Sequence, residues 1–151
     1  MRFGAGFPVD RRHGIAGLGC LMRLVLAWLA MLVVSVLNGV AREVGYGRDL
    51  DPLLAHQLST LYGMTLLGVV IGAYAWRWPF PHATAAWLAG LFWVAMTVAF
   101  EFLFFHYVAG HSWTELLANY DLASGRLWVL LLAWIGVAPA LFRRLYSGRR
   151  R

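Results

Sequence analysis

The run LVLAWLAMLVVSVLNGVA occupies residues 24–41, between Arg23 and Arg42, and contains no ionisable side chain. An α-helix rises about 1.5 Å per residue, so about 20 apolar residues cross the roughly 30 Å hydrocarbon core of a bilayer. The flanking arginines extend the run, because their long side chains reach the lipid headgroups. The run therefore predicts a transmembrane helix.

Three further runs have the same character. They lack Asp, Glu, Lys and Arg and occupy residues 52–76, 78–100 and 127–142. The last is short for a span, but Arg126 and Arg143 can extend it in the same way. We predict an all-α fold, an integral membrane four-helix bundle that forms a single transmembrane domain over residues 1–151. The spans are expected at about 21–41, 54–76, 82–105 and 125–143.

The composition restricts the class of protein. Hydrophobic residues make up 61% of the chain and charged residues 13%, against roughly 45–50% and 25% in soluble domains. The net charge is +6, yet the arginines lie at the ends of the apolar runs rather than along a stripe with interleaved aromatic residues. This distribution is a signal of membrane topology, and we expect no nucleic-acid partner. Cys20 is the single cysteine, so the chain forms no intrachain disulfide.

The segments between the spans carry turn and cap signals. Pro79 and Pro81 predict a tight turn between the second and third spans. Ser112 and Glu115 have the spacing of a helix capping box. We therefore expect a short interfacial helix between the third and fourth spans, at about 112–121. Its lipid-facing side chains would be Trp113, Leu116, Leu117 and Tyr120.

The arginines also predict the orientation. Ten lie in the two terminal tails or beside them and at Arg77, whereas only Arg42, Arg48 and Arg126 lie on the other side. Because cytoplasmic segments carry the excess of positive charge, both termini, with their short basic tails, are expected in the cytoplasm. A cleaved signal peptide that ends near Ala41 is an alternative for the first run, although no A-x-A site is present.

Polar side chains form stripes on the first three predicted spans. The stripes comprise Ser35, Asn38 and Arg42 on the first, His56, Ser59, Thr60 and Gly63 on the second, and Gly90, Thr97 and Glu101 on the third. The fourth span has none. We expect three helices to meet through these stripes while the fourth packs against them as an apolar wall. Packing alone is the commoner role of such small and hydroxylated residues, including the Gly68 and Gly72 pair.

Glu101 is the most informative of these residues. An ionisable group inside the span is costly unless it is paired or protonated. The best candidate partner is Arg42, with Glu43 or His56 next. A structural ion pair is the first interpretation, a carboxylate that handles protons or binds a cation is the second, and snorkelling into water is the third.

A metal or haem site is the alternative that involves the histidines. His56, Glu101, His106 and His111 are of the types that bind zinc, copper or iron. The spacings E-x4-H and H-x4-H do not match a ligand pair on one helix face, however. An intramembrane hydrolase based on Ser59 and His56 is also open, but no G-x-S-x-G motif or phosphate loop is present.

The tryptophans are interpreted by depth. Trp128 is expected to mark the outer membrane interface. Trp93 and Trp134 lie deeper in their runs and are expected to face lipid or a partner.

Three strings occur together in a distinctive order. They are NGVARE at 38–43, AHQLST at 55–60, and EFLFFHYVAGHSW at 101–113, followed by GRLW at 125–128. In this order they resemble a group of small bacterial membrane proteins of uncharacterised function. The resemblance covers about residues 24–142. It implies a four-helix protein of the bacterial inner membrane and transfers no activity.

The leading hypothesis is a non-catalytic accessory, assembly or transport-related component of the inner membrane. Its working surface would be the polar periplasmic end, formed by Asn38, Arg42, Glu43, His56, Gln57, Glu101, His106, His111 and Trp113. The alternatives are a membrane metal- or haem-binding protein or enzyme that uses the His/Glu cluster, and a proton-coupled small carrier centred on Glu101. No cofactor is predicted. The expected partners are the lipid bilayer and either further copies of the chain or a larger membrane protein.

Overall fold

The computed structural model describes residues 11–148, with side chains from Gly17 onward. Within these residues all regular structure is helical. The long helices are α1 (Arg11–Val44), α2 (Pro52–Arg77), α3 (Ala83–Tyr107) and α5 (Trp128–Gly148), and the short ones are α4 (Trp113–Ala118) and the 3₁₀ turns η1 (Tyr46–Asp49) and η2 (Leu122–Ser124). Of the predicted basic tails, Arg2 and residues 149–151 lie outside the described residues.

Four of the helices are long and apolar enough to cross a membrane. The all-α prediction is therefore confirmed, and the described chain has the architecture of a multi-pass membrane protein. Helix α1 extends beyond the predicted 21–41 at both ends. The last helix begins later than the predicted position 125, because Gly125 adopts a left-handed conformation (φ 84°) that ends η2.

Local signals explain where the helices begin. The Asp51 side chain accepts hydrogen bonds from the first turn of α2, and Pro52 occupies the position where a missing N–H costs nothing. His82 caps α3 by accepting from the amide of Ala85. The predicted capping box at the start of α4 is confirmed, since the Ser112 and Glu115 side chains each accept from the other residue's amide.

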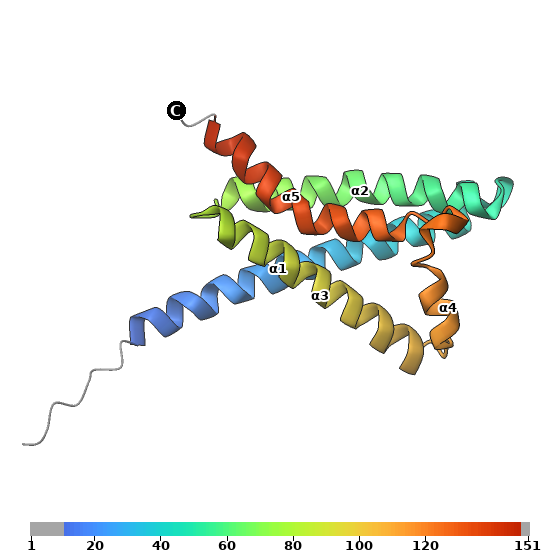
Figure 1. Ribbon diagram of the computed structural model, residues 1–151, viewed down its shortest axis with the longest axis horizontal. Helices are drawn as coiled ribbons and strands as arrows, with labels where there is room; N and C mark the ends of the chain where they lie inside the picture. Colours follow the sequence, from blue (N-terminus) through green and yellow to red (C-terminus); the bar gives the residue numbers. More distant parts are fainter. Residues whose placement is uncertain (1–10, 149–151) are drawn as a thin grey trace, which may run out of the picture.

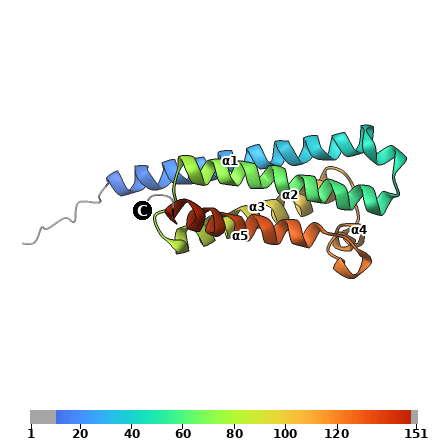
Figure 2. The same ribbon diagram turned by 90° about the horizontal axis from the view of Figure 1, so that it is seen from above.

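Helix α5 lies between α2 and α3. It packs extensively against both α2 and α3, α1 packs mainly against α2, and α1 and α3 contact each other only sparsely (Figures 1 and 2). The prediction that the fourth span forms an outer apolar wall is therefore wrong. In Figure 1 the C-terminal end of α3 inclines away from α2, and α4 leads the chain back to α5.

Glycines on α2 and α3 explain this position of α5. A Cβ atom at Gly90 would collide with the backbone of Gly136, so these two helices cross at van der Waals contact of their backbones. On α2, a Cβ atom at Gly68 would lie 3.2 Å from the Trp134 ring. A Cβ atom at Gly72 would lie 3.2 Å from the Phe142 ring. Small residues thus let the bulky side chains of α5 approach both neighbours, as in other membrane helix pairs.

Indole N–H groups connect the helices in pairs. Trp93 donates to the Leu24 carbonyl at 2.9 Å and is fully buried. Trp134 donates to the Met64 carbonyl at 2.8 Å. The prediction that Trp93 and Trp134 face lipid or a partner is therefore wrong. An apolar surrounding offers no water to satisfy an indole N–H, so each ring turns inward to a carbonyl that the other helix supplies.

Candidate functional site

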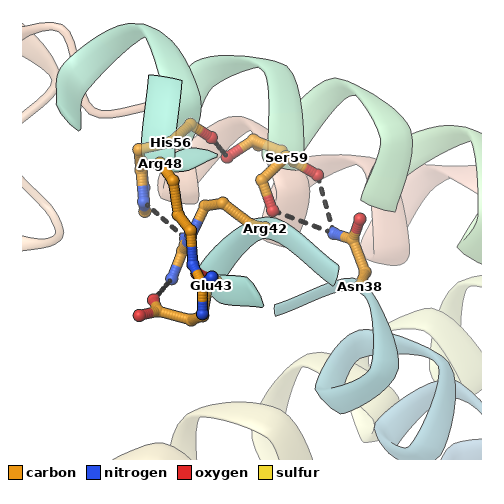
Figure 3. A network of polar contacts seen from close by, with 7 residues as sticks. Asn38, Arg42, Glu43, Arg48, His56 and Ser59 are labelled. Atoms are coloured by element: carbon orange, nitrogen blue, oxygen red, sulfur yellow. Dashed lines mark hydrogen bonds and ion pairs between the residues drawn. The ribbon is translucent and has the colours of Figure 1, made fainter. Parts of the chain in front are cut away.

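The ends of α1 and α2 carry a connected polar group. Arg42 donates to the Glu43 carboxylate at 2.7 Å, and its other terminal nitrogen lies 3.3 Å from Nδ1 of His56 (Figure 3). One turn away, the amide nitrogen of Asn38 donates to the carbonyl and hydroxyl oxygens of Ser59 at 2.8 and 3.1 Å. The prediction that the polar stripes of the first two spans meet is therefore confirmed.

The contact between Arg42 and His56 identifies the tautomer of the histidine. A guanidinium group only donates hydrogen bonds, so Nδ1 of His56 must be the acceptor. In the neutral ring the proton then resides on Nε2. This atom is buried and has no hydrogen-bond partner among the described residues. Within the described part of the chain the site therefore holds a donor with no acceptor, an arrangement that is uncommon in buried polar groups.

Glu101 belongs to a second group, on α3, α5 and the segment between them. Its side chain is 5% exposed, and Oε2 accepts from the Tyr120 hydroxyl at 2.6 Å and from Nε1 of Trp128 at 2.9 Å. The predicted pairing of Glu101 with Arg42 is therefore wrong, because Arg42 lies against Glu43 and His56. In the third polar stripe Gly90 and Glu101 turn toward α5, whereas Thr97 accepts a hydrogen bond from the indole of Trp28 on α1 at 3.2 Å.

Tyr120 is one of the functional residues that the sequence did not reveal. Burial, followed by the hydrogen bond to Glu101, raises the pKa of the Tyr120 hydroxyl far above its ordinary value. The hydroxyl therefore remains a donor at every physiological pH. The prediction that Tyr120 and Leu116 face lipid is wrong, because Tyr120 points to Glu101 and Leu116 is buried. Helix α4 turns Leu116 inward and leaves Trp113 and Leu117 exposed, and Tyr120 follows its last turn.

A third group of polar and aromatic side chains lies at the start of α4. His106 donates from Nδ1 to the His111 carbonyl at 2.9 Å, and its ring stacks on Trp113 with 3.9 Å between the centroids. His111 lies 3.5 Å from the Glu115 carboxylate. Hydrogen bonds from Ser112, and the nearby His111, lower the pKa of Glu115. These contacts fix the loop and the first turn of α4.

Two further contacts join the connection before α5 to the other helices. Gln57 donates to the Gly125 carbonyl at 3.0 Å, and Arg126 donates to the Asn119 side chain at 2.7 Å. Arg126 appeared in the sequence only as a snorkelling residue. A charged residue next to a span is a signal that could have placed Arg126 among the candidate site residues. The direction in which its side chain points follows from the turn at Gly125.

The structure thus distributes the predicted cluster over these separate groups. Asn38, Arg42, Glu43 and His56 lie together, while Glu101 contacts Tyr120 and Trp128, Gln57 contacts the loop, and His106, His111 and Trp113 surround α4. The proposed metal set was His56, Glu101, His106 and His111. Among the side chains that the structure describes, from residue 17 to 148, no three of His, Cys, Asp or Glu are grouped closely enough to hold a metal ion.

Two cavities meet at Arg42, Glu43, His56 and Arg126. The smaller has a volume of about 550 Å³ and lies against η1 and the start of α2, where Arg48 also lines it. The larger has a volume of about 810 Å³ and lies between α1 and α3, with α2, α4 and α5 contributing to its walls. We call this larger space the α1–α3 cleft.

The α1–α3 cleft is polar at one end and mainly apolar along the rest of its length, where Ser35 and Thr97 also line it. Its polar end is formed by the four residues that it shares with the smaller cavity, together with Glu101 and Asn119. Its apolar part is lined by Trp28, Met31, Phe100, Leu131 and Ile135, among others. The cleft exists because α3 inclines away from α1 and α2 at the end that bears the polar residues (Figure 1).

Known proteins add no further assignment. No protein-family model, no curated protein and no solved structure matched this chain.

Proposed function

We propose that this protein is a non-catalytic membrane component that binds an amphiphile in the α1–α3 cleft. The amphiphile enters from the bilayer between α1 and α3, and its headgroup lies at Arg42, His56 and Arg126. The single observation that carries this proposal is the amphipathic cleft of about 810 Å³, which continues into a polar cavity at one end only. Binding of an amphiphile would be the specific task of this accessory or transport-related component.

The dimensions of the cleft support a chain-bearing ligand. On α1 the lining residues extend from Trp28 to Glu43, a distance of about 22 Å at a helical rise of about 1.5 Å per residue. One leaflet accounts for about half of a hydrocarbon core roughly 30 Å thick. An acyl or prenyl chain that lies along α1 therefore finds apolar walls over its whole length, while its headgroup stays at the polar end.

The position of Glu101 supports this activity over proton-coupled transport. A carrier would need this carboxyl to change its protonation and its contacts during transport. Glu101 instead holds α3, α5 and the segment after α4 together through Tyr120 and Trp128. We assign it a structural role at the wall of the cleft.

The same proposal includes the cellular setting. We place the protein in the bacterial inner membrane, with the polar end of the cleft at the periplasmic side and both termini in the cytoplasm. Among the described residues, Arg11, Arg12, Arg23, Arg77, Arg143 and Arg144 lie toward one end of the bundle, and Arg42, Arg48 and Arg126 toward the other. This asymmetry supports the orientation.

We also propose that the protein works with a partner, either a second copy or a larger membrane protein. Helix α1 supports this idea, because side chains along its length are exposed, including Leu18, Leu26, Val33 and Leu37. Lipid covers such a surface as readily as a protein does. Crosslinking in native membranes distinguishes the two, and a strictly monomeric species would count against a partner.

Photolabelling tests the amphiphile site directly. The protein is reconstituted with phosphatidylcholine or phosphatidylglycerol probes that carry a diazirine in the acyl chain, and the adducts are mapped by peptide mass spectrometry. Either probe is expected to label Trp28, Met31 and Phe100 in excess of the outward side chains Val69 and Leu88, which are 66% and 60% exposed. Equal labelling of all apolar faces would show only annular lipid and would contradict the proposal.

A matched pair of variants on α1 sharpens this test. A Cβ atom at Gly39 or at Gly19 meets no atom within 4 Å, so both positions accept a larger side chain without a clash. Gly39 lines the cleft, and Gly19 does not. Gly39→Phe is expected to reduce labelling inside the cleft to the level of the outer faces, and Gly19→Phe is expected to leave it unchanged.

A further inference from the structure

We infer that the natural ligand of the α1–α3 cleft is a lipid with an anionic, phosphate-bearing headgroup. This inference rests on the proposed function and adds the chemical class of the ligand. It depends on the charges around the polar end of the cleft, whereas the proposed function depends on the apolar walls. An experiment can therefore contradict the anionic headgroup and leave the amphiphile site intact, or contradict both.

The polar end offers donors that the protein leaves unused. Arg42 and Arg126 line both cavities, and Arg48 lines the smaller one. A guanidinium group has five N–H donors, and Arg126 directs one of them to Asn119. His56 adds its Nε2–H, which has no partner among the described residues. Phosphate oxygens accept several charge-assisted hydrogen bonds at once and match the planar fork of arginine.

The carboxylates along the cleft do not cancel this preference. Three line it, Glu43, Glu101 and Glu115. Glu101 already accepts two side-chain hydrogen bonds, and Glu115 accepts from the amide of Ser112. Of the three, Glu43 alone shares a donor with the headgroup, since it pairs with Arg42, and its side chain is 69% exposed. A bound phosphate would compete with Glu43 for Arg42.

A lipid explains both cavities together, whereas a free phosphate explains only one. A small anion would fill part of the 550 Å³ cavity and leave the apolar cleft of about 810 Å³ without a function. A phospholipid places its phosphate at Arg42, His56 and Arg126, where the cavities meet, and its chain along Trp28 and Ile135. The membrane supplies such a ligand at high concentration, and its chain enters from the side that α3 leaves open.

Native mass spectrometry tests the headgroup. The purified protein is offered equal amounts of phosphatidylglycerol and phosphatidylcholine with identical acyl chains. Both lipids carry the phosphate, but the quaternary ammonium of phosphatidylcholine is repelled by Arg42 and Arg126, so phosphatidylglycerol is expected to bind about tenfold more tightly. Glycerol 3-phosphate, which carries the phosphate without the chains, is expected not to displace it.

Charge-removing variants identify the residues involved. Arg42→Gln and Arg126→Gln are each expected to remove most of the preference for phosphatidylglycerol. Glu43→Gln frees Arg42 and is expected to increase the preference, a gain that misfolding cannot produce. Arg77→Gln, at the opposite end of α2, is the matched control and is expected to change nothing.

The other outcomes separate the two proposals. Equal binding of both lipids, with cleft labelling intact, would overturn the anionic headgroup and leave the amphiphile site standing. Displacement by glycerol 3-phosphate would show that the site takes a free phosphate compound and would overturn the lipid. Retention of neither lipid would overturn the amphiphile site itself. Equal losses in Arg77→Gln and Arg42→Gln would show general attraction of anionic lipid to arginine and would also overturn the inference.

Discussion

Glu101 shows how a single carboxyl group is accommodated inside an apolar helix. The buried side chain accepts from Tyr120 and Trp128, both of them neutral donors. A hydrogen bond typically contributes about 0.5–1.5 kcal/mol, and about 1.5–3 kcal/mol where one partner is charged. Because the donors come from α5 and from the segment after α4, this one group connects three parts of the chain.

The variant Tyr120→Phe isolates the stronger of these two contacts. It removes the 2.6 Å hydrogen bond and little else. We expect it to lower the free energy of unfolding in detergent by about 1–3 kcal/mol. Tyr107, which is 71% exposed, provides the control, and Tyr107→Phe should stay within about 0.5 kcal/mol of the wild type.

A double-mutant cycle then identifies the partner of Glu101. In the Glu101→Leu background, Tyr120→Phe is expected to cost clearly less than in the wild type, because the contact is already gone. Arg42→Ala is expected to cost the same in both backgrounds. Coupling of Glu101 to Arg42, with none to Tyr120, would contradict the arrangement described above.

At the scale of the helices, the crossing of α3 and α5 depends on the absence of side chains. Gly90 lies against the Gly136 backbone, and a methyl group there has no space. In an ordinary helix, exchanging glycine for alanine is favourable by about 0.5–1 kcal/mol. At this crossing the steric cost exceeds that gain, because a backbone cannot move aside as the end of a flexible side chain can.

Gly90→Ala is accordingly expected to destabilise the protein by about 1–3 kcal/mol. Gly39→Ala is the matched control, since its added methyl group enters open space. It should be neutral or stabilising by up to about 1 kcal/mol. Unfolding of the two variants in the same detergent compares them, and a Gly90→Ala protein as stable as Gly39→Ala would rule out the close crossing.

At the scale of the whole molecule, the inclination of α3 creates the cleft, and the proposed orientation places the polar end of the cleft in the periplasm. Toward the ends of α1 and α3 that bear the polar groups, the helices separate, and α4 bridges from α3 back to α5 (Figure 1). Placing this end in the periplasm directs the cleft toward the outer leaflet. The leaflet from which the ligand enters therefore follows from the orientation of the chain.

Cysteine labelling of intact cells tests that orientation. In a Cys20→Ser background, Thr114→Cys is expected to react with a membrane-impermeant maleimide, because Thr114 is exposed beside the polar end. Ser147→Cys, exposed near the end of α5, is expected to react only after permeabilisation. The reverse pattern would refute cytoplasmic termini and would turn the cleft toward the inner leaflet.

Sequence alone was enough for everything that depends on neighbouring residues. The apolar runs predict the long helices, because a helix satisfies its backbone hydrogen bonds within itself wherever it lies in lipid. The capping box at Ser112 and the contact of the first two polar stripes were also predictable. Asn38 and Ser59 lie on helices joined by a short loop, so the register of this pair follows from the chain.

Tertiary structure alone decided which side chains meet across distant segments. Glu101 contacts Tyr120 and Trp128 rather than Arg42, and α5 packs between α2 and α3. The physical reason is that the hydropathy of a side chain indicates that it avoids water. It does not distinguish a side chain that faces lipid from one that faces another helix. The tilt of α3 and the direction of Arg126 result from steric fit, at the Gly90 crossing and at the Gly125 turn, and not from the periodicity of the runs.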